Sequence, residues 1–123
     1  MMEQQMNYVH ASIEEFKDGL AWFSEQLPSV GEKFIAFTDA CFSDGAVSEK
    51  NKHLIALGIA VQSQDEYCIM FHCHNAMRLG ASDQEILETL GVCSAFGGGA
   101  ALSQGVTLVQ DVLADLTTPR DQH

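Results

Sequence analysis

The most chemically reactive residues in this chain are Cys68 and His72, which lie four positions apart. If the segment around them is helical, the two side chains lie one turn apart on the same face. An imidazole at that spacing is close enough to hold or accept the thiol proton, and a cysteine is a good nucleophile only as the thiolate. The pair therefore indicates thiol chemistry. The alternative is a small buried cysteine beside an interior histidine.

Asp65 lies about one turn before Cys68 and is expected to change the reactivity of the thiol. A carboxylate near the sulfur disfavours the thiolate, so it should raise the thiol pKa and make Cys68 less reactive. The alternative role for Asp65 is structural. An acidic residue at a helix N-terminus interacts favourably with the helix dipole, whether or not it takes part in chemistry.

A metal site is a second interpretation of the same residues. Six residues offer the nitrogen, sulfur and oxygen donors that zinc and related ions accept, namely His53, Asp65, Cys68, His72, Cys73 and His74. Consecutive helical residues point in different directions, so only a subset such as His53, Cys68 and His72 could share one ion. Cys73 is turned about 140° from Cys68 on a helix, so these two cysteines cannot form a disulfide within it.

A recurring helix-start pattern organises the chain around these residues. A Ser followed three residues later by a Glu lets both side chains cap exposed backbone N–H groups. It predicts helix starts at Ser12 with Glu15, Ser29 with Glu32, Ser63 with Glu66, and Ser82 with Glu85. Ser48 is expected to cap a further helix. The helix that begins at Ser63 would carry Cys68 and His72 and end at Gly80.

Apolar residues recur at helical spacing in most of these segments. The first stripe is Ile13, Phe16, Leu20 and Phe23, ended near Pro28; the second is Val30, Phe34, Phe37 and Cys41, ended around residues 44–45. The run at 54–61 is apolar on all sides and is predicted to be buried. The fifth helix runs through Ile86, Leu87, Leu90 and Cys93. Cys41 and Cys93 are assigned to the core.

The last segment places Leu102, Val106, Val109, Leu113 and Leu116 on one seam that fits packing against another helix. The run Gly97-Gly98-Gly99 before it lacks the Lys and Ser/Thr of a phosphate-binding loop and predicts a tight helix junction. No alternation typical of strands occurs. The fold class predicted is all-α with about six helices.

Composition favours one soluble domain over residues 1–123. The net charge of −11 repels phosphate backbones and makes nucleic acid an unsuitable partner. No apolar run is long enough to span a bilayer, and residues 1–10 do not read as a secretion signal. We therefore expect a cytoplasmic protein with no membrane partner, in which the four cysteines are reduced unless one is a working thiol.

Residues from about 49 to 105 resemble the carboxymuconolactone decarboxylase and AhpD-like alkylhydroperoxidase family. The matching phrases are HLIALGIAV from His53, YCIMFH from Tyr67, LGASDQEILETLGV from Leu79 and FGGGAAL from Phe96. The resemblance implies an all-helical fold, trimers or hexamers of the chain, and a peroxidase or disulfide-reductase role for members that keep the redox motif.

That motif consists of a Glu, a Cys, a second Cys and a His, and an ungapped comparison places His53, Asp65, Cys68 and His72 at these positions. The second Cys and the His are kept, whereas the usual C-x-x-C disulfide cannot form. If the helices pack as in the family, His53 could pass a proton to His72 or Cys68. Otherwise it is a surface histidine in the first turn of its helix.

These observations predict a thiol-dependent, peroxiredoxin-type peroxidase or disulfide oxidoreductase. Cys68 would be the nucleophile, His72 its base, and His53 and Asp65 further members of the site. No cofactor is expected; the partners would be other copies of the chain, a small hydroperoxide and an external thiol reductant. Three alternatives stay open: an acid–base enzyme of the decarboxylase kind that does not need cysteine, a metal-binding protein, and a helical oligomer that binds a small molecule.

Overall fold

Five helices make up the part of the chain that the structure describes. The computed structural model describes residues 2–115, with side chains from Tyr8 onward. Its helices are α1 (Met2–Gln26), α2 (Pro28–Phe42), α3 (Glu49–Ser63), α4 (Glu66–Arg78) and α5 (Asp83–Leu113), and no strand occurs among these residues. The predicted all-α class is confirmed. There are five elements because α5 continues through the glycine run, where only Gly98 leaves helical geometry.

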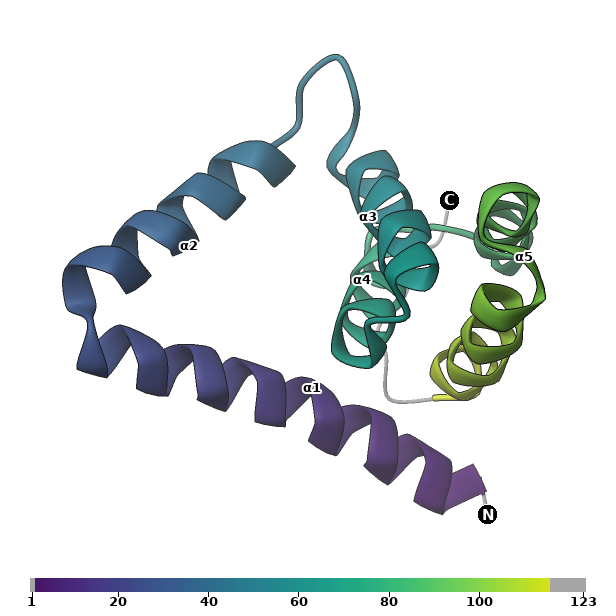
Figure 1. Ribbon diagram of the computed structural model, residues 1–123, viewed down its shortest axis with the longest axis horizontal. Helices are drawn as coiled ribbons and strands as arrows, with labels where there is room; N and C mark the ends of the chain where they lie inside the picture. Colours follow the sequence, from purple (N-terminus) through teal and green to yellow (C-terminus); the bar gives the residue numbers. More distant parts are fainter. Residues whose placement is uncertain (1, 116–123) are drawn as a thin grey trace.

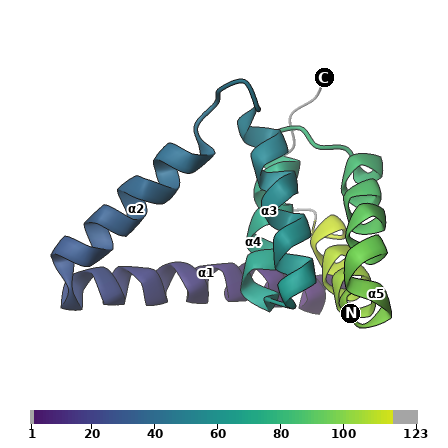
Figure 2. The same ribbon diagram turned by 45° about the horizontal axis from the view of Figure 1, so that its top comes forward.

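The helices form a packed bundle and a protruding hairpin. Helices α3, α4 and α5 pack on one another, and α1 crosses α4 and α5 (Figure 1). Helix α2 turns back from the end of α1, so that α1, α2 and α3 trace three sides of a triangle. Figure 2 shows that α2 begins away from the bundle, at the far end of α1, and slants back toward it until the chain enters α3. The bundle is therefore the rigid frame, and α2 is attached to it mainly at its ends.

The hydrophobic core lies between α3, α4 and α5, and α1 adds one end. Its largest fully buried side chains are Val9, Leu57, Val61, Ile69, Met70, Cys73, Met77, Ile86, Leu90, Val109 and Val112. Removing this apolar surface from water is the main favourable term in folding. Because both α3 and α4 contribute to this core, their relative placement is fixed by packing.

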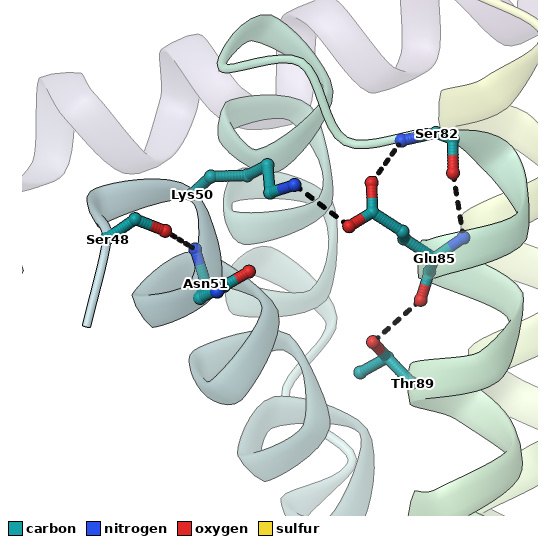
Figure 3. A network of polar contacts seen from close by, with 6 residues as sticks. All are labelled: Ser48, Lys50, Asn51, Ser82, Glu85 and Thr89. Atoms are coloured by element: carbon teal, nitrogen blue, oxygen red, sulfur yellow. Dashed lines mark hydrogen bonds and ion pairs between the residues drawn. The ribbon is translucent and has the colours of Figure 1, made fainter.

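Two of the predicted helix starts are confirmed in atomic detail. The Ser48 side chain accepts a hydrogen bond from the Asn51 backbone N–H at 3.1 Å, and Ser82 and Glu85 form a reciprocal capping box. Glu85 also accepts from Lys50 Nζ at 2.8 Å, so the starts of α3 and α5 are tied together (Figure 3). The Lys50 hydrogen bond is the main reason why the Glu85 pKa is lowered.

The predicted helix start at Ser12 is wrong, and the one at Ser29 is correct to within two residues. Ser12 lies buried inside α1, which begins at Met2, because a Ser-x-x-Glu pattern also fits the interior of a long helix. Ser29 is the second residue of α2, after Pro28, and the N-cap Leu27 makes no side-chain hydrogen bond. The fixed φ of Pro28 suits the first helical position and replaces the predicted cap.

The predicted start at Ser63 is wrong. Ser63 is the last residue of α3, where its hydroxyl donates back to the Ile59 carbonyl at 2.8 Å. Gln64 then adopts a left-handed conformation with φ of 56°, and Asp65 becomes the N-cap of α4. As a result, Cys68 lies in the first turn of α4, nearer the helix start than the sequence indicated.

Several apolar residues assigned to the interior are exposed. Along α2, Phe37 is 66% exposed and Cys41 is exposed, so the assignment of Cys41 to the core is wrong. Helix α3 buries Leu57 and Val61 but leaves Ile59 63% exposed, so the prediction of burial on all sides is wrong too. These side chains lie on faces that no element of the described chain covers.

The second half of α5 follows the predicted seam in part. Val109 is buried, Leu102 and Leu113 pack at the edge of the core, and Val106 is largely exposed. The predicted seam residue Leu116 lies outside the described residues. Cys93, on the first half, is buried as predicted.

By length and composition, α5 is the one described helix that could cross a membrane, with a mean hydropathy of 1.3 in its most apolar stretch. The break at Gly98, with φ of 70° and ψ of −164°, divides it near its middle. Each half is then shorter than the roughly 20 residues that a spanning helix needs. A core helix passes the same test of composition, and the cytoplasmic location expected from the sequence stays a prediction.

Candidate functional site

The packing of α3 on α4 brings two histidines into contact. His53 Nδ1 lies 3.0 Å from His72 Nδ1, and His53 is only 7% exposed. His53 is thus an interior residue, and the alternative that it is a surface histidine is wrong. Two imidazole nitrogens at this distance share one proton, so one Nδ1–H donates and the other Nδ1 accepts.

The aromatic ring of Phe42, at the end of α2, covers this histidine pair. Its centroid lies 4.6 Å from that of His53 and 5.3 Å from that of His72, and both ring pairs are stacked. Phe71 meets His72 edge to face from α4 itself. The two imidazoles are therefore held in position by a contact with α2, the helix that is least attached to the bundle.

Burial keeps both imidazoles uncharged at neutral pH. Desolvation lowers the pKa of His53 to about 4, and the nearby His72 and Arg78 act in the same direction. Desolvation also lowers the pKa of His72 to about 4, opposed by the carboxylate of Asp65. A neutral imidazole has one nitrogen that donates and one that accepts, so the pair is suited to moving a proton without gaining net charge.

The pKa of Cys68 is raised, whereas those of the two histidines are lowered. Burial, the largest cause, together with the hydrogen bond and the charge of Asp65 raises the thiol pKa to about 11. The same carboxylate caps α4 by accepting from the Cys68 backbone N–H at 3.2 Å. The direction of the shift agrees with the sequence prediction. Both roles considered for Asp65 are therefore compatible, since it caps the helix and also holds the thiol in its protonated form.

The side chains of His53, Cys68 and His72 line one cavity of about 570 Å³ that is bounded by α1, α2, α3 and α4. Phe16, Leu20, Phe34, Phe42 and Phe71 supply its apolar wall, and Thr38, Asp39, Ser43, Glu49, His53, Cys68, His72 and Asn75 its polar and titratable groups. A pocket that is mostly apolar and has a few convergent polar groups is typical of small-molecule sites. Asp65 acts on this site from the start of α4 and is not part of the lining.

Sequence reasoning missed Phe42, Asp39 and Glu49 as residues of the cavity. Of the predicted apolar stripe of α2, only Phe34 lines the cavity, and it does so with Thr38 and Phe42. The i, i+4 spacing of those three residues was the available signal, but nothing local shows which face of α2 turns inward.

The metal reading gains no support from the geometry. Among the residues that the structure describes, no group of three or more His, Cys, Asp or Glu side chains is arranged to hold an ion. Cys73 is fully buried in the core, and His74 is not part of the cavity lining. Of the six candidate donors, the structure brings together His53 and His72, with Cys68 in the same cavity.

A five-helix bundle with a histidine pair and a cysteine in one cavity matches known proteins over most of its length. Residues 28–111 match the carboxymuconolactone decarboxylase family, and the chain belongs to that family. The crystal structure of apo-lpg0406, a carboxymuconolactone decarboxylase family protein from Legionella pneumophila, superposes with a TM-score of 0.82 at 30% identity. That match covers 89% of this chain and 97% of the other.

Two curated relatives are similar over a shorter stretch. Uncharacterized protein 4 in the cox locus of Paracoccus denitrificans is 36% identical over 73 residues, which is 59% of this chain and 66% of the relative. An uncharacterized protein of Cupriavidus necator is 32% identical over 72 residues, 58% of this chain and 64% of that protein. The chain thus spans a little under two thirds of the length of these relatives.

Proposed function

We propose that this protein reduces small hydroperoxides, or disulfides, at Cys68, with His72 and His53 carrying the proton. The observation behind the proposal is that all three side chains line one cavity in which the imidazoles are in contact. Membership of the family adds support, because the resemblance implies a peroxidase or disulfide-reductase role for members that keep the redox motif, of which this chain keeps two positions. Cys68 and His72 occupy the second-cysteine and histidine positions of that motif.

The raised thiol pKa determines the form of the reaction. At neutral pH Cys68 is the thiol, so the proton must leave as the sulfur attacks. The sulfur bonds to the terminal oxygen of ROOH, the O–O bond breaks, and the products are a sulfenic acid on Cys68 and ROH. A neutral His72 accepts the thiol proton, and the relay with His53 returns a proton to the departing oxygen. No isolated anion then forms in the apolar cavity.

An external thiol completes the cycle. Asp65 stands where the family has the first cysteine, and Cys73 is buried in the core, so neither can resolve the sulfenic acid on Cys68. A thiol RSH attacks the sulfenic sulfur, releases water and leaves a mixed disulfide. A second RSH then restores Cys68 and leaves as RSSR. Overall, ROOH and two RSH give ROH, RSSR and water.

A second candidate is acid–base catalysis by the histidine pair without cysteine chemistry. The observation that favours it is the thiol pKa of about 11, which leaves a very small thiolate fraction at neutral pH. In this case His53 and His72 would move a proton to or from a carbon or oxygen atom of a small molecule, and Cys68 would be part of the wall. The decarboxylase for which the family is named belongs to this reaction class.

Replacing the cysteine separates the two candidates. Cys68→Ser should abolish consumption of cumene hydroperoxide with dithiothreitol and remove the one trappable sulfenic acid from the intact mass. Cys93→Ser, a buried cysteine outside the cavity, is the matched control and should retain both. His72→Ala should slow the reaction roughly 10²–10⁴-fold, as general-base removal does. Full consumption by Cys68→Ser would contradict the thiol mechanism.

Two further measurements address the alternatives. Treatment with a chelator should leave peroxide consumption intact, whereas dependence on stoichiometric zinc lost in His72→Ala would favour a metal site. For acid–base catalysis, solvent deuterium should exchange into a bound ketone in Cys68→Ser and not in His53→Ala.

A further inference from the structure

Carboxylates are the charged groups that line the cavity. Asp39 of α2 and Glu49 of α3 are both part of its wall, and both count as negative in the formal charge of the chain. The imidazoles of His53 and His72 are uncharged there, because burial lowers their pKa values to about 4. No lysine or arginine is present among the described residues of the lining. The wall that a ligand touches is therefore apolar with a net negative charge.

Two cations hydrogen-bond to residues of this wall without being part of the lining. Lys52 donates from Nζ to the backbone carbonyl of Ser43 at 2.6 Å, and its side chain lines a different hollow beside Cys41. Arg78 donates to the side-chain oxygen of Asn75 at 3.2 Å. Both cations therefore already have a hydrogen-bond partner in residues of the wall. An anionic ligand in the cavity would face a lining that contains two carboxylates and no cation among the described residues.

We propose that Asp39 and Glu49 make this site selective for neutral organic substrates and exclude those that carry a carboxylate. The proposal rests on the proposed function and names its substrate class, an uncharged hydroperoxide with a hydrocarbon body. Moving an anion out of water into an apolar cavity is costly, and nearby like charges add to that cost. The five apolar residues of the wall suit the hydrocarbon part of a neutral substrate, while Thr38, Ser43 and Asn75 can hydrogen-bond its oxygen atoms.

A pair of unreactive ligands tests the selectivity without turnover. The probes are cumyl alcohol, the neutral product of cumene hydroperoxide reduction, and its 4-carboxylate, which differs only by the added charged group. Binding is followed at pH 7.5 by the NMR shifts of the His53 and His72 rings. Wild type should bind the neutral alcohol at least tenfold more tightly. Asp39→Asn with Glu49→Gln should reduce that ratio severalfold, whereas Glu88→Gln, a surface change on α5, should not.

Equal affinities in wild type, tighter binding of the carboxylate, or an unchanged ratio in the double variant would each overturn the proposal. Failure of the neutral alcohol to shift the histidine rings would overturn it as well, since the cavity would not be the ligand site. The outcome is distinct from the fate of the thiol mechanism. Neutral-ligand selectivity in a protein whose Cys68 does not react with peroxide would retain this inference and refute the peroxidase function.

Discussion

Helices α3 and α2 differ in how many of their apolar side chains the rest of the described chain buries. Helix α3 buries Leu57, Ala60 and Val61 in the core and holds His53 against His72. Helix α2 buries Gly31, where Ser24 leaves no room for a side chain, and exposes most of its large apolar residues. Both helices contribute to the same cavity. The site is therefore built from one wall fixed by the core and one wall, with Phe42, that the bundle supports weakly.

The largest expected effect contrasts a core residue of α3 with an exposed residue of α2. Leu57→Ala should lower the free energy of unfolding by about 2–5 kcal/mol, because Leu57 is fully buried and truncation leaves a cavity. Phe37→Ala should change it by less than about 0.5 kcal/mol in a monomer, since that ring is 66% exposed. Urea denaturation of both variants at low protein concentration measures the difference. A loss at Phe37 as large as at Leu57 would mean that α2 is covered by another chain.

The next effect concerns what covers the exposed faces. We propose that the protein assembles into an oligomer of at least three subunits, because α2 exposes Phe37 and a hollow between α3 and α5 exposes Ile59 and Phe96. Exposed apolar patches of this kind mark interaction surfaces. Light scattering at micromolar concentration should report the oligomer, and Phe37→Asp or Phe96→Asp should weaken association about 100-fold or more. A wild-type monomer under these conditions would refute the assembly.

The histidine pair predicts a pH dependence of stability. In the unfolded chain the two imidazoles titrate near the ordinary value of about 6.5, whereas in the folded protein their pKa values are about 4. As pH falls from 6.5 to 4, the unfolded chain takes up protons first, so the free energy of unfolding decreases through this window and levels off below it. Each shift corresponds to roughly 3 kcal/mol at most, and solvent screening of these partly buried groups makes the observed loss smaller.

Urea melts at pH 7.5 and 4.5 measure this loss, with the double variant His53→Gln/His72→Gln for comparison. The double variant should lose clearly less stability than wild type between the two pH values. Burial also lowers the pKa of His74, which contributes its own share to the same window. An identical loss in the double variant would show that the pair does not titrate as described.

The sequence predicts those features of the fold that depend on neighbouring residues alone. Caps at true helix boundaries depend only on neighbours three residues away, and the predictions at Ser48 and at Ser82 with Glu85 are confirmed. The same pattern at Ser12 was misleading, because local spacing does not show whether the helix had already begun. The all-α class needed only helical periodicity, which survives errors at the boundaries.

The site was predictable to the extent that one helix defines it. Cys68 and His72 line the same cavity because i, i+4 residues of α4 share a face. The contact of His53 with His72 depends on the packing of α3 on α4, and only the family resemblance indicated it. Phe42 and Asp39 come from α2, whose inward face is set by tertiary structure and not by its own apolar stripe.

The smallest effect concerns Asp65, which links the start of α4 to the thiol. Asp65→Asn should lower the pKa of Cys68 from its present value of about 11, because a hydrogen-bonding carboxylate is removed while burial, the larger cause, stays. Alkylation of Cys68 by iodoacetamide at pH 8.5 should then become about tenfold faster, since one pKa unit changes the thiolate fraction tenfold. Peroxide consumption should rise in the same sense if the sulfur attack limits it.

A change in the helix cap is the confounding effect, although Asn caps a helix about as well as Asp, and α3 offers a control in which a cap is removed outright. Ser48→Ala removes a cap of the same kind from a helix that carries no cysteine, and each cap should contribute about 1 kcal/mol to stability. If faster alkylation came from fraying or general loosening, both variants should show it. Because the carboxylate acts on Cys68 directly, we expect the rate to rise in Asp65→Asn and to stay at the wild-type value in Ser48→Ala. An unchanged rate in Asp65→Asn would show that burial alone sets the thiol pKa.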